Sequence, residues 1–186
     1  MPNAILDPTG QRDRASGGGA FTLAPRRRDL RGARVGLLIN TKRNAETFLH
    51  EVGRLLEAEH GAASVTARTK LAFAQPVPPE MLKELSSECD VVVTGVGDCG
   101  SCSASAVTDG IMLEREGIPA AVICSDAFGA SADAIAGLRG APGYRYLTTR
   151  HPVAVLTPDE VRGRARQVLP DVVSLLTAGG EAGQPS

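Results

Sequence analysis

The sequence predicts one α/β domain of three layers, in which helices cover both faces of a five-stranded parallel sheet. Three observations predict this fold class. Short apolar runs alternate with helical patterns along the chain, the apolar runs are continuous instead of alternating with polar residues, and no internal repeat is present. The chain has 186 residues, of which 42% are hydrophobic and 22% are charged, and this is enough for a single buried core.

The apolar runs are expected to be buried strands. They cover residues 34–40, 64–69, 91–94, 120–124 and 146–149, and the run at 64–69 has the weaker pattern. For this alternation the flavodoxin-like or Rossmann-like strand order 2-1-3-4-5 is expected, which makes strands 1 and 3 neighbours and sends their helices to opposite faces. The crevice between these two strands, at their carboxyl ends, is the expected ligand site.

A helical pattern follows each strand. Asn44 is expected to cap the first helix and Gly61 to end it. Its apolar stripe consists of Phe48, Val52, Leu55 and Leu56. Pro76, Pro78 and Pro79 are expected to start the second, short helix. The others are expected over 103–114, 130–138 and 158–176, the last with a kink near Pro170.

Residues 1–31 and 178–186 lack a hydrophobic period and flank the α/β domain at 32–177. The first segment is rich in Gly, Pro, Asp and Arg, and we expect an extended N-terminal arm with a solvated arginine run at 26–28. The second segment is small and polar, and we expect a disordered tail there.

Composition excludes several functions. A net charge of −1 and an aromatic content of 3% argue against a nucleic-acid partner. No apolar run of ~18 residues is present, so no membrane span is expected, and the N-terminus lacks a signal-peptide core, which predicts a cytoplasmic protein. No phosphate loop, nucleotide fingerprint or flavin signature is visible, so we expect no nucleotide cofactor and an external thiol as the electron source.

Cys99-Gly100-Ser101-Cys102 lies where a strand turns into a helix. Backbone N–H groups and the helix dipole stabilise a thiolate there, so Cys99 is the expected attacking sulfur and Cys102 the resolving one. The small Gly100 and Ser101 leave the first sulfur open to a substrate. Two packed thiols are the alternative. A structural zinc is disfavoured because no second C-x-x-C or paired His accompanies the motif, and Cys89 is expected to be structural.

Polar residues after the first strand are candidate substrate-binding groups. The segment runs Asn40-Thr41-Lys42-Arg43-Asn44. Lys42 can hold a carboxylate or phosphate, or lower the pKa of a nearby thiol, and the alternative is a solvated basic loop. Asn40 and Asn44 can orient a polar substrate, although capping also accounts for Asn44.

Three further residues lie at the same predicted edge of the sheet. Asp98 is either a proton acceptor or a plain helix cap. Asp126 follows Cys124 and Ser125 at the end of the fourth strand, where it borders the site or caps a helix. His151 follows the fifth strand, and a lone His is more often structural than catalytic.

Two motifs in combination resemble the UGSC family of selenoproteins and their cysteine homologues. They are the segments 98–102 and 113–119. Residues 6–10 and the loop 38–45 are similar to other segments of that family. The resemblance implies that Cys99 occupies the selenocysteine position, which favours it over Cys102 as the reactive atom. The local context is also similar to the selenocysteine-bearing subunits of glycine and betaine reductases, which cleave a carbon–heteroatom bond through a selenol.

These inferences predict a thiol-dependent oxidoreductase acting on a small-molecule substrate, with Asp98 or His151 moving a proton and no metal. Two alternatives stay open. One is a non-redox lyase, transferase or hydrolase with Cys99 as covalent nucleophile, and the other is a binding or accessory subunit of a larger enzyme. The motif at residues 6–10 suggests that the arm packs over the crevice or across a homodimer.

Overall fold

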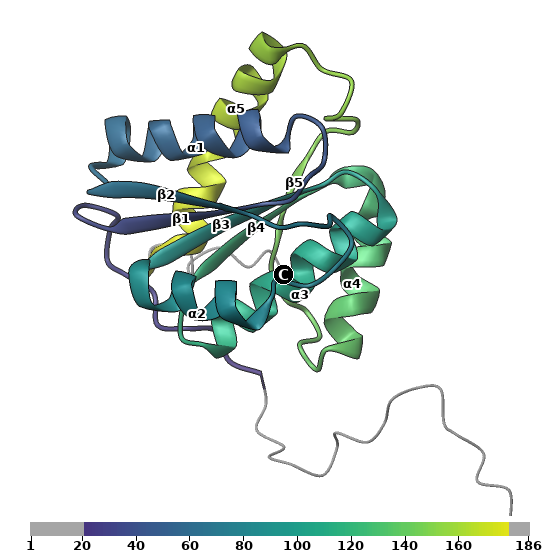
Figure 1. The fold of residues 1–186 in the computed structure, drawn as a ribbon, viewed down its shortest axis with the longest axis horizontal. Helices are drawn as coiled ribbons and strands as arrows, with labels where there is room; N and C mark the ends of the chain where they lie inside the picture. Colours follow the sequence, from purple (N-terminus) through teal and green to yellow (C-terminus); the bar gives the residue numbers. More distant parts are fainter. Residues whose placement is uncertain (1–20, 179–186) are drawn as a thin grey trace, which may run out of the picture.

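The computed structural model describes residues 21–178, which form a five-stranded, all-parallel sheet with the order β2-β1-β3-β4-β5. The strands are β1 (Arg34–Ile39), β2 (Ser64–Thr69), β3 (Val91–Gly97), β4 (Ala120–Ser125) and β5 (Leu147–Thr149). Figure 1 shows the twisted sheet running through the middle of the molecule. The predicted three-layer fold and its strand order are confirmed.

Helices cover both faces of this sheet, as doubly wound connections require. They are α1 (Ala45–His60), α2 (Pro79–Glu88), α3 (Gly100–Arg115), α4 (Gly129–Leu138) and α5 (Pro158–Leu176). α1 and α5 lie on one face and α2, α3 and α4 on the other (Figure 1). Between residues 21 and 178, no helix combines the length and the apolar character that crossing a membrane requires.

The sheet divides the core into two layers. Val93 of β3 packs in the cluster with α1 and α5, whereas its neighbour Val92 packs in the cluster with α2 and α3. Both side chains are buried, which is why the sequence of this strand is a continuous apolar run. β2 is an edge strand with half-buried residues, and its weaker sequence pattern follows from that position.

β3 ends in a closely packed glycine segment. A Cβ placed on Gly95 would lie 2.6 Å from the carbonyl oxygen of Ile123, and its φ of +145° also disfavours other residues. The register between β3 and β4 shifts between Gly95 and Gly97. The strand therefore continues to Gly97, three residues beyond the apolar run, and delivers the chain directly to the first turn of α3.

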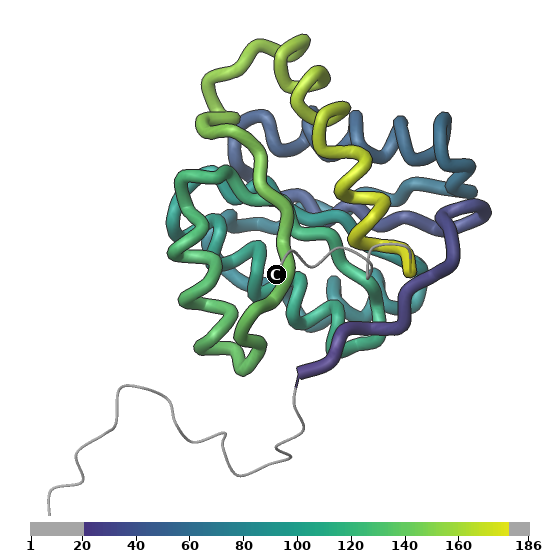
Figure 2. Tube along the Cα trace, turned by 180° about the vertical axis from the view of Figure 1, so that it is seen from behind, coloured from purple at the N-terminus to yellow at the C-terminus, as the bar shows by residue number. Residues whose placement is uncertain are grey.

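Residues 21–31 pack against the domain. The Arg26 guanidinium donates to both oxygens of Glu114, at 2.7 and 2.8 Å, and its side chain is only 6% exposed. The prediction of a solvated arginine run is therefore wrong for Arg26, because a buried carboxylate on α3 binds it. The backbones of Arg27 and Thr177 pair in an isolated parallel β-bridge, so this segment and the end of α5 lie side by side (Figure 2). The motif at residues 6–10 lies outside the described residues, as does the predicted tail at 178–186 except for Ala178.

The loop after β1 corrects another prediction. Asn44 precedes α1 but its side chain does not cap the helix, and its φ is +70°. Instead, its amide nitrogen donates to the carbonyls of Val153 and Leu156, both at 2.9 Å. Gly61 ends α1 in a left-handed conformation, as predicted. Asn44 therefore joins the loop after β1 to the loop that connects β5 with α5.

Candidate functional site

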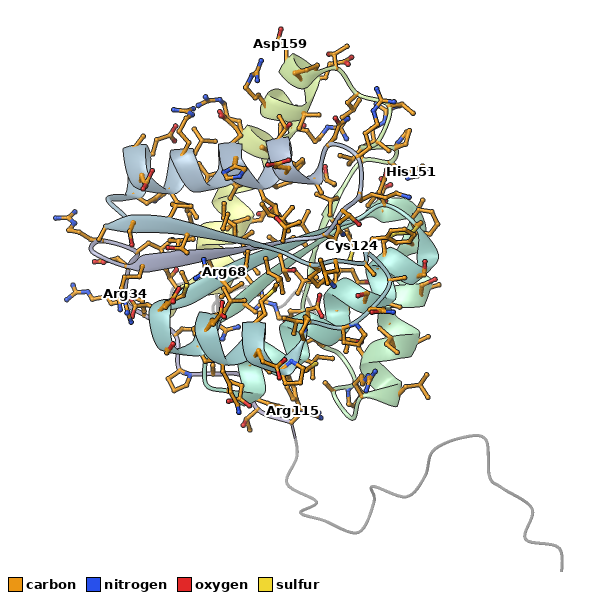
Figure 3. The ribbon with its side chains drawn as sticks, in the orientation of Figure 1. Arg34, Arg68, Arg115, Cys124, His151 and Asp159 are labelled. Carbon is orange, nitrogen blue, oxygen red and sulfur yellow. A yellow bond between two sulfur atoms is a disulfide. The ribbon has the colours of Figure 1, made fainter. Side chains whose placement is uncertain are left out.

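The predicted site residues gather at the carboxyl end of the sheet. Figure 3 shows Cys124 and His151 on the side where the strands end, opposite Arg34 at the start of β1. Because β1 lies between β2 and β3, chain connections leave this edge in opposite directions, with α1 on one face and α3 on the other. Such a switch point is where open α/β sheets bind ligands.

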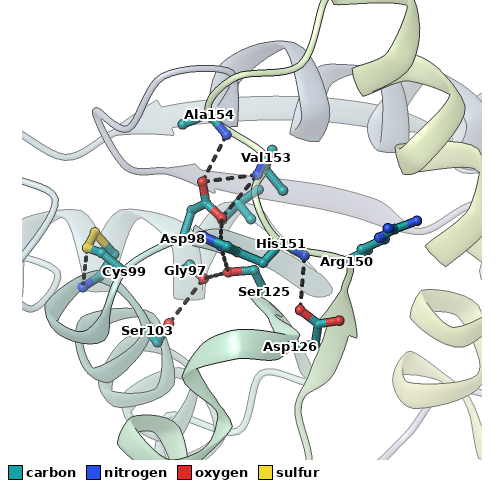
Figure 4. A network of polar contacts seen from close by, with 12 residues as sticks. Gly97, Asp98, Cys99, Ser103, Ser125, Asp126, Arg150, His151, Val153 and Ala154 are labelled. Carbon is teal, nitrogen blue, oxygen red and sulfur yellow. Dashed lines mark hydrogen bonds and ion pairs between the residues drawn. A yellow bond between two sulfur atoms is a disulfide. The ribbon is translucent and has the colours of Figure 1, made fainter.

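Cys99 occupies the N-cap position of α3 and is bonded to Cys102 in a disulfide, with Cα atoms 5.2 Å apart. The Cys99 Sγ accepts a hydrogen bond from the backbone N–H of Cys102 at 3.2 Å (Figure 4). The same sulfur lies 3.6 Å from the hydroxyl of Ser101. Cys99 is half-buried, whereas Cys102 is fully buried. The sulfur that an incoming molecule can reach is therefore that of Cys99.

The N-terminus of α3 supplies the electrostatics of this sulfur. The first N–H groups of a helix have no partner within the helix, and the aligned peptide dipoles leave a positive potential there. The Sγ of Cys99 accepts a hydrogen bond from one of these groups, the backbone N–H of Cys102. In the reduced protein the same contact favours the thiolate of Cys99, which is the nucleophilic form of cysteine.

Asp98 is buried and binds the loop after β5, so it is not a helix cap. Its two carboxylate oxygens accept the N–H of Val153 at 3.1 Å, and Oδ2 accepts the N–H of Ala154 at 2.8 Å. Oδ1 also lies 3.0 Å from Nδ1 of His151. The residue just before Cys99 therefore fixes a loop that begins more than fifty positions later in the chain.

The contacts of His151 determine which ring nitrogen carries the proton. Nδ1 lies between Asp98 and the hydroxyl of Ser125, which is 3.3 Å away. The Ser125 hydroxyl donates its single proton to the carbonyl of Gly97 at 3.1 Å, and the Asp98 carboxylate only accepts. Nδ1 is therefore the protonated nitrogen of the neutral ring, which leaves the lone pair on Nε2 for a substrate or a thiol.

Further contacts hold the His151 ring and backbone in place. Asp126 accepts the backbone N–H of His151 at 2.9 Å, and the Phe128 ring packs edge-on against the imidazole with centroids 5.2 Å apart. Ser103 donates to the same Gly97 carbonyl as Ser125, at 3.1 Å. Figure 4 shows these contacts joining the ends of β3, β4 and β5 into one network. Asp126 is thus a partner of the His151 backbone instead of a helix cap.

The residues after β1 lie beside this network with their own protein contacts. Asn40 is buried, donates to the carbonyl of Val96 at 3.0 Å and accepts the N–H of Lys42 at 3.0 Å. The Lys42 ammonium lies 5.5 Å from the centre of the Phe73 ring, a cation–π contact, and Thr41 is exposed. The amide of Asn40 shapes the loop, while Thr41 is exposed and Lys42 is half-buried.

The other two cysteines are buried and unreactive by environment. Burial raises the pKa of Cys124 to about 12. Burial is also the largest cause that raises the pKa of Cys89, which packs under β1. The prediction of a structural Cys89 agrees with this packing. Residues 21–178 contain no group of three or more His, Cys, Asp or Glu side chains that is arranged to hold a metal ion.

Sequence reasoning missed two features of this edge. The first is the contact of Ser125 with His151, which depends on a loop crossing from β5 toward β3. The second is a buried ion pair between Lys70 and Asp109 that holds the loop after β2 against α3. A lysine directly after a strand and an aspartate among apolar residues of a helix are the sequence signals that could have identified this pair.

Comparison with known proteins identifies the family. The model of the UGSC family matches residues 4–178, which is nearly the whole chain and includes the Cys99–Cys102 turn and the Asp98–His151 pair. No curated protein matches the sequence. A family match of this extent settles the resemblance seen in the motif around Cys99, and the chain belongs to the UGSC family.

Proposed function

We propose that this protein is a thiol-dependent enzyme in which Cys99 is the nucleophilic or redox centre for a small electrophilic substrate. One observation carries the proposal: an accessible sulfur at a helix N-terminus lies next to a buried partner sulfur and follows directly on an aspartate that orients a histidine. Membership of the UGSC family is consistent with a cysteine-based function. A purely structural disulfide has no need of the oriented histidine.

In the proposed reductive reaction, both cysteines begin as thiols. The Cys99 thiolate attacks an electrophilic atom of the substrate, a sulfur–substrate bond forms, and the leaving group departs. Cys102 then attacks the Sγ of Cys99, and the Cys99–Cys102 disulfide forms while the substrate fragment leaves with the electron pair of its bond to sulfur and takes up a proton. The two thiols lose two electrons, which the substrate gains. An external thiol reduces the disulfide and closes the cycle.

Asp98 and His151 have separate roles in this proposal. His151 moves the proton at Nε2, since Nδ1 is occupied by Asp98 and Ser125. Among the described residues, no hydrogen bond joins Asp98 to either sulfur. Asp98 acts by holding the His151 ring and the loop at Val153 in place. Lys42, Thr41 and Asn44 remain proposed substrate-binding residues at the same edge. An external thiol as reductant and a cytoplasmic location fit a thiol that must be reduced in every cycle.

The experiment is trapping of an adduct. The reduced Cys102→Ser variant is incubated with cell extract, and the intact protein is weighed by mass spectrometry. A stable mass increase on Cys99 in this variant, together with a Cys99–Cys102 disulfide in the wild-type protein after turnover, is the expected result. Cys99→Ser is the negative control and Cys124→Ser the matched positive control, because Cys124 is buried away from solvent. An adduct that forms equally in Cys99→Ser would overturn the proposal.

A non-redox reaction is the second candidate, and the Asp98–His151 pair favours it specifically. Covalent lyases, transferases and hydrolases also combine a nucleophilic cysteine with a histidine that a carboxylate orients. Here the orienting carboxylate belongs to Asp98, the residue directly before Cys99. In that case Cys102 only supports Cys99, so Cys102→Ser retains turnover and no disulfide accumulates. The same variant therefore separates the two reactions. Stable capture of a second protein with no adduct would instead favour an accessory subunit.

A further inference from the structure

A pocket opens on the outer side of α3, between α4 and the loop after β2. It has a volume of about 190 Å³. Its floor consists of small residues on one face of α3, and its walls come from the loop and from α4. The lining residues are Ala74, Pro76, Ser101, Ala104, Ser105, Thr108, Ile135 and Arg139. The volume suits a small metabolite and is below that of pockets for drug-sized molecules.

One end of the pocket adjoins the proposed reactive sulfur. Ser101 lines the pocket, and its hydroxyl lies 3.6 Å from the Sγ of Cys99. From Ser101 to Thr108 the floor extends over seven residues of helix, which is roughly 10 Å at 1.5 Å per residue. A molecule in the pocket would therefore present one end to Cys99 and hold its other end about two helical turns away.

The middle of the pocket is apolar in character. Ala74, Pro76 and Ile135 contribute carbon surfaces from the walls. The hydroxyls of the floor are already engaged: Thr108 donates to the carbonyl of Ala104 at 2.8 Å, and Ser105 donates to the carbonyl of Gln75 at 2.7 Å. The body of a ligand there gains more from apolar contact than from hydrogen bonds.

The far end of the pocket carries uncompensated positive charge. The guanidinium of Arg139 has no ion pair or hydrogen bond with any of residues 21–178. Arg115 donates to the backbone carbonyl of Arg139 at 2.5 Å and, within the same part of the chain, likewise has no acidic partner. Two neighbouring arginines without a carboxylate favour an anion, and Arg binds a carboxylate through two parallel hydrogen bonds.

The loop wall of the pocket is held rigidly in place. The Lys70 ammonium is 3% exposed and donates to the carbonyl of Gln75 at 2.8 Å, to the hydroxyl of Ser105 at 2.9 Å and to Asp109. The other oxygen of Asp109 accepts the N–H of Val77 at 2.7 Å. These contacts fix residues 75–77 against α3, so the pocket exists before any ligand enters.

We infer that this pocket binds the substrate, and that the substrate is a small molecule with an apolar body and a carboxylate that Arg139 holds. The inference rests on the proposed reactivity of Cys99, because the pocket then places the other end of the molecule at that sulfur. A short acid such as acetate cannot span from Arg139 to Cys99, so the inference also sets a minimum length. Arg139 would then select substrates that carry a negative charge.

The test uses electrophiles of graded length. The reduced full-length protein is treated with ω-bromoalkanoic acids from bromoacetic to 8-bromooctanoic acid, and with the ω-bromoalcohols of the same lengths. In each reaction the Cys99 thiolate forms a carbon–sulfur bond and bromide leaves. For each chain length, the labelling rate of the acid is divided by that of the alcohol. This ratio is expected to be highest at an intermediate chain length, where it is about fivefold larger than for the shortest pair. Arg139→Gln is expected to abolish this maximum, and Arg139→Lys to retain part of it.

Controls separate this inference from the proposed function. Arg162→Gln alters an exposed arginine of α5, on the other face of the sheet, and is expected to leave the maximum unchanged. If iodoacetamide fails to label Cys99, the proposed function is wrong. If iodoacetamide labels Cys99 but the acid-to-alcohol ratio is independent of length or of Arg139, only the inference about the pocket is wrong. If the rates for all probes rise when residues 1–20 are removed, that segment covers the pocket. If the rates fall as the protein concentration increases, a second copy of the chain covers it. Either result would overturn the inference about the pocket.

Discussion

Nδ1 of His151 lies 3.0 Å from Oδ1 of Asp98, although the two residues are separated by 53 positions in the chain. The same carboxylate accepts the N–H groups of Val153 and Ala154. One side chain therefore both orients the imidazole and fixes the loop that carries it. Since Asp98 directly precedes Cys99, a displacement of this loop would shift the residue next to the reactive cysteine.

The first prediction concerns Asp98→Asn. The amide group keeps one acceptor oxygen but turns its NH₂ toward backbone N–H groups, so at least one hydrogen bond is lost and two donors face each other. We expect the free energy of unfolding to fall by about 2 kcal/mol. The downfield proton resonance of the His151 Nδ1–H, observed by NMR, is expected to disappear, and alkylation of Cys99 to slow.

Asp126→Asn is the matched control for that experiment. Asp126 is exposed and accepts only the backbone N–H of His151, which an Asn oxygen also accepts. Its effect on stability is expected to stay within about 0.5 kcal/mol. Equal losses in Asp98→Asn and Asp126→Asn would mean that the buried carboxylate has no special part in positioning His151.

The second prediction concerns selective labelling of the cysteines. After reduction, iodoacetamide at pH 8 is expected to label Cys99 first. Cys102 is fully buried, and the pKa values of Cys89 and Cys124 are raised by burial, the latter to about 12, so their thiolates are scarce and inaccessible. Peptide mapping by mass spectrometry measures the order. Faster labelling of Cys102 would reverse the proposed roles of the two sulfurs.

The third prediction concerns Gly97, whose backbone carbonyl joins Ser103 and Ser125. A Cβ at Gly97 would lie 2.7 Å from the Cα of Ser103 and 2.9 Å from the Sγ of Cys124. Since one of these atoms is backbone, Gly97→Ala must displace the first turn of α3. We expect a loss of about 1–3 kcal/mol in the free energy of unfolding and slower labelling of Cys99.

Gly163→Ala provides a control of opposite sign for the glycine experiment. Gly163 lies inside α5, and a Cβ there would meet no atom within 4 Å. Alanine favours the helix over glycine, so a gain of about 0.5–1 kcal/mol is expected in chemical denaturation. Destabilisation by both substitutions would show that the close approach at Gly97 is not the cause.

The fold was accessible to sequence reasoning because its signals are local. Continuous apolar runs marked strands covered on both faces, Gly61 marked the end of α1, and Pro158 marked the start of α5. The carboxyl edge follows from the strand order, which places Cys99 and His151 on the same edge of the sheet. The helix after Cys99 was predicted over 103–114 and is observed as α3 over Gly100–Arg115, one turn longer at its start.

The contacts that were missed depend on pairs of residues far apart in the chain. Asn44 looked like a cap, but it donates to a loop more than a hundred residues away. Arg26 looked solvated as one of three arginines, yet Glu114 on α3 buries it. In each case the sequence suggested a local role or exposure to solvent, whereas the observed partner is distant in the chain and is set by the packing of the elements.

The fourth prediction is a double-mutant cycle on Lys70 and Asp109. Both side chains are buried, and burial is the largest cause that raises the pKa of Asp109, against the opposing charge of Lys70. Lys70→Met or Asp109→Leu alone leaves one buried charge unpaired, and each is expected to cost about 3–5 kcal/mol. The double variant is expected to lose far less than the sum, as measured by urea denaturation. Additive losses would show that the pair does not interact.

The last prediction is a pH dependence that arises from Asp90. Its carboxylate accepts the backbone N–H of Arg34 at 2.8 Å and the guanidinium at 3.0 Å, and these contacts with Arg34 lower the pKa of Asp90. A carboxyl whose pKa is lower in the folded state stabilises the protein above the unfolded pKa, and this contribution disappears as pH falls through the folded pKa. Asp90→Asn is therefore expected to cost about 1 kcal/mol at pH 7 and progressively less below about pH 4. Urea denaturation of both proteins across this range measures the difference, and a difference independent of pH would mean that the charge of Asp90 contributes nothing.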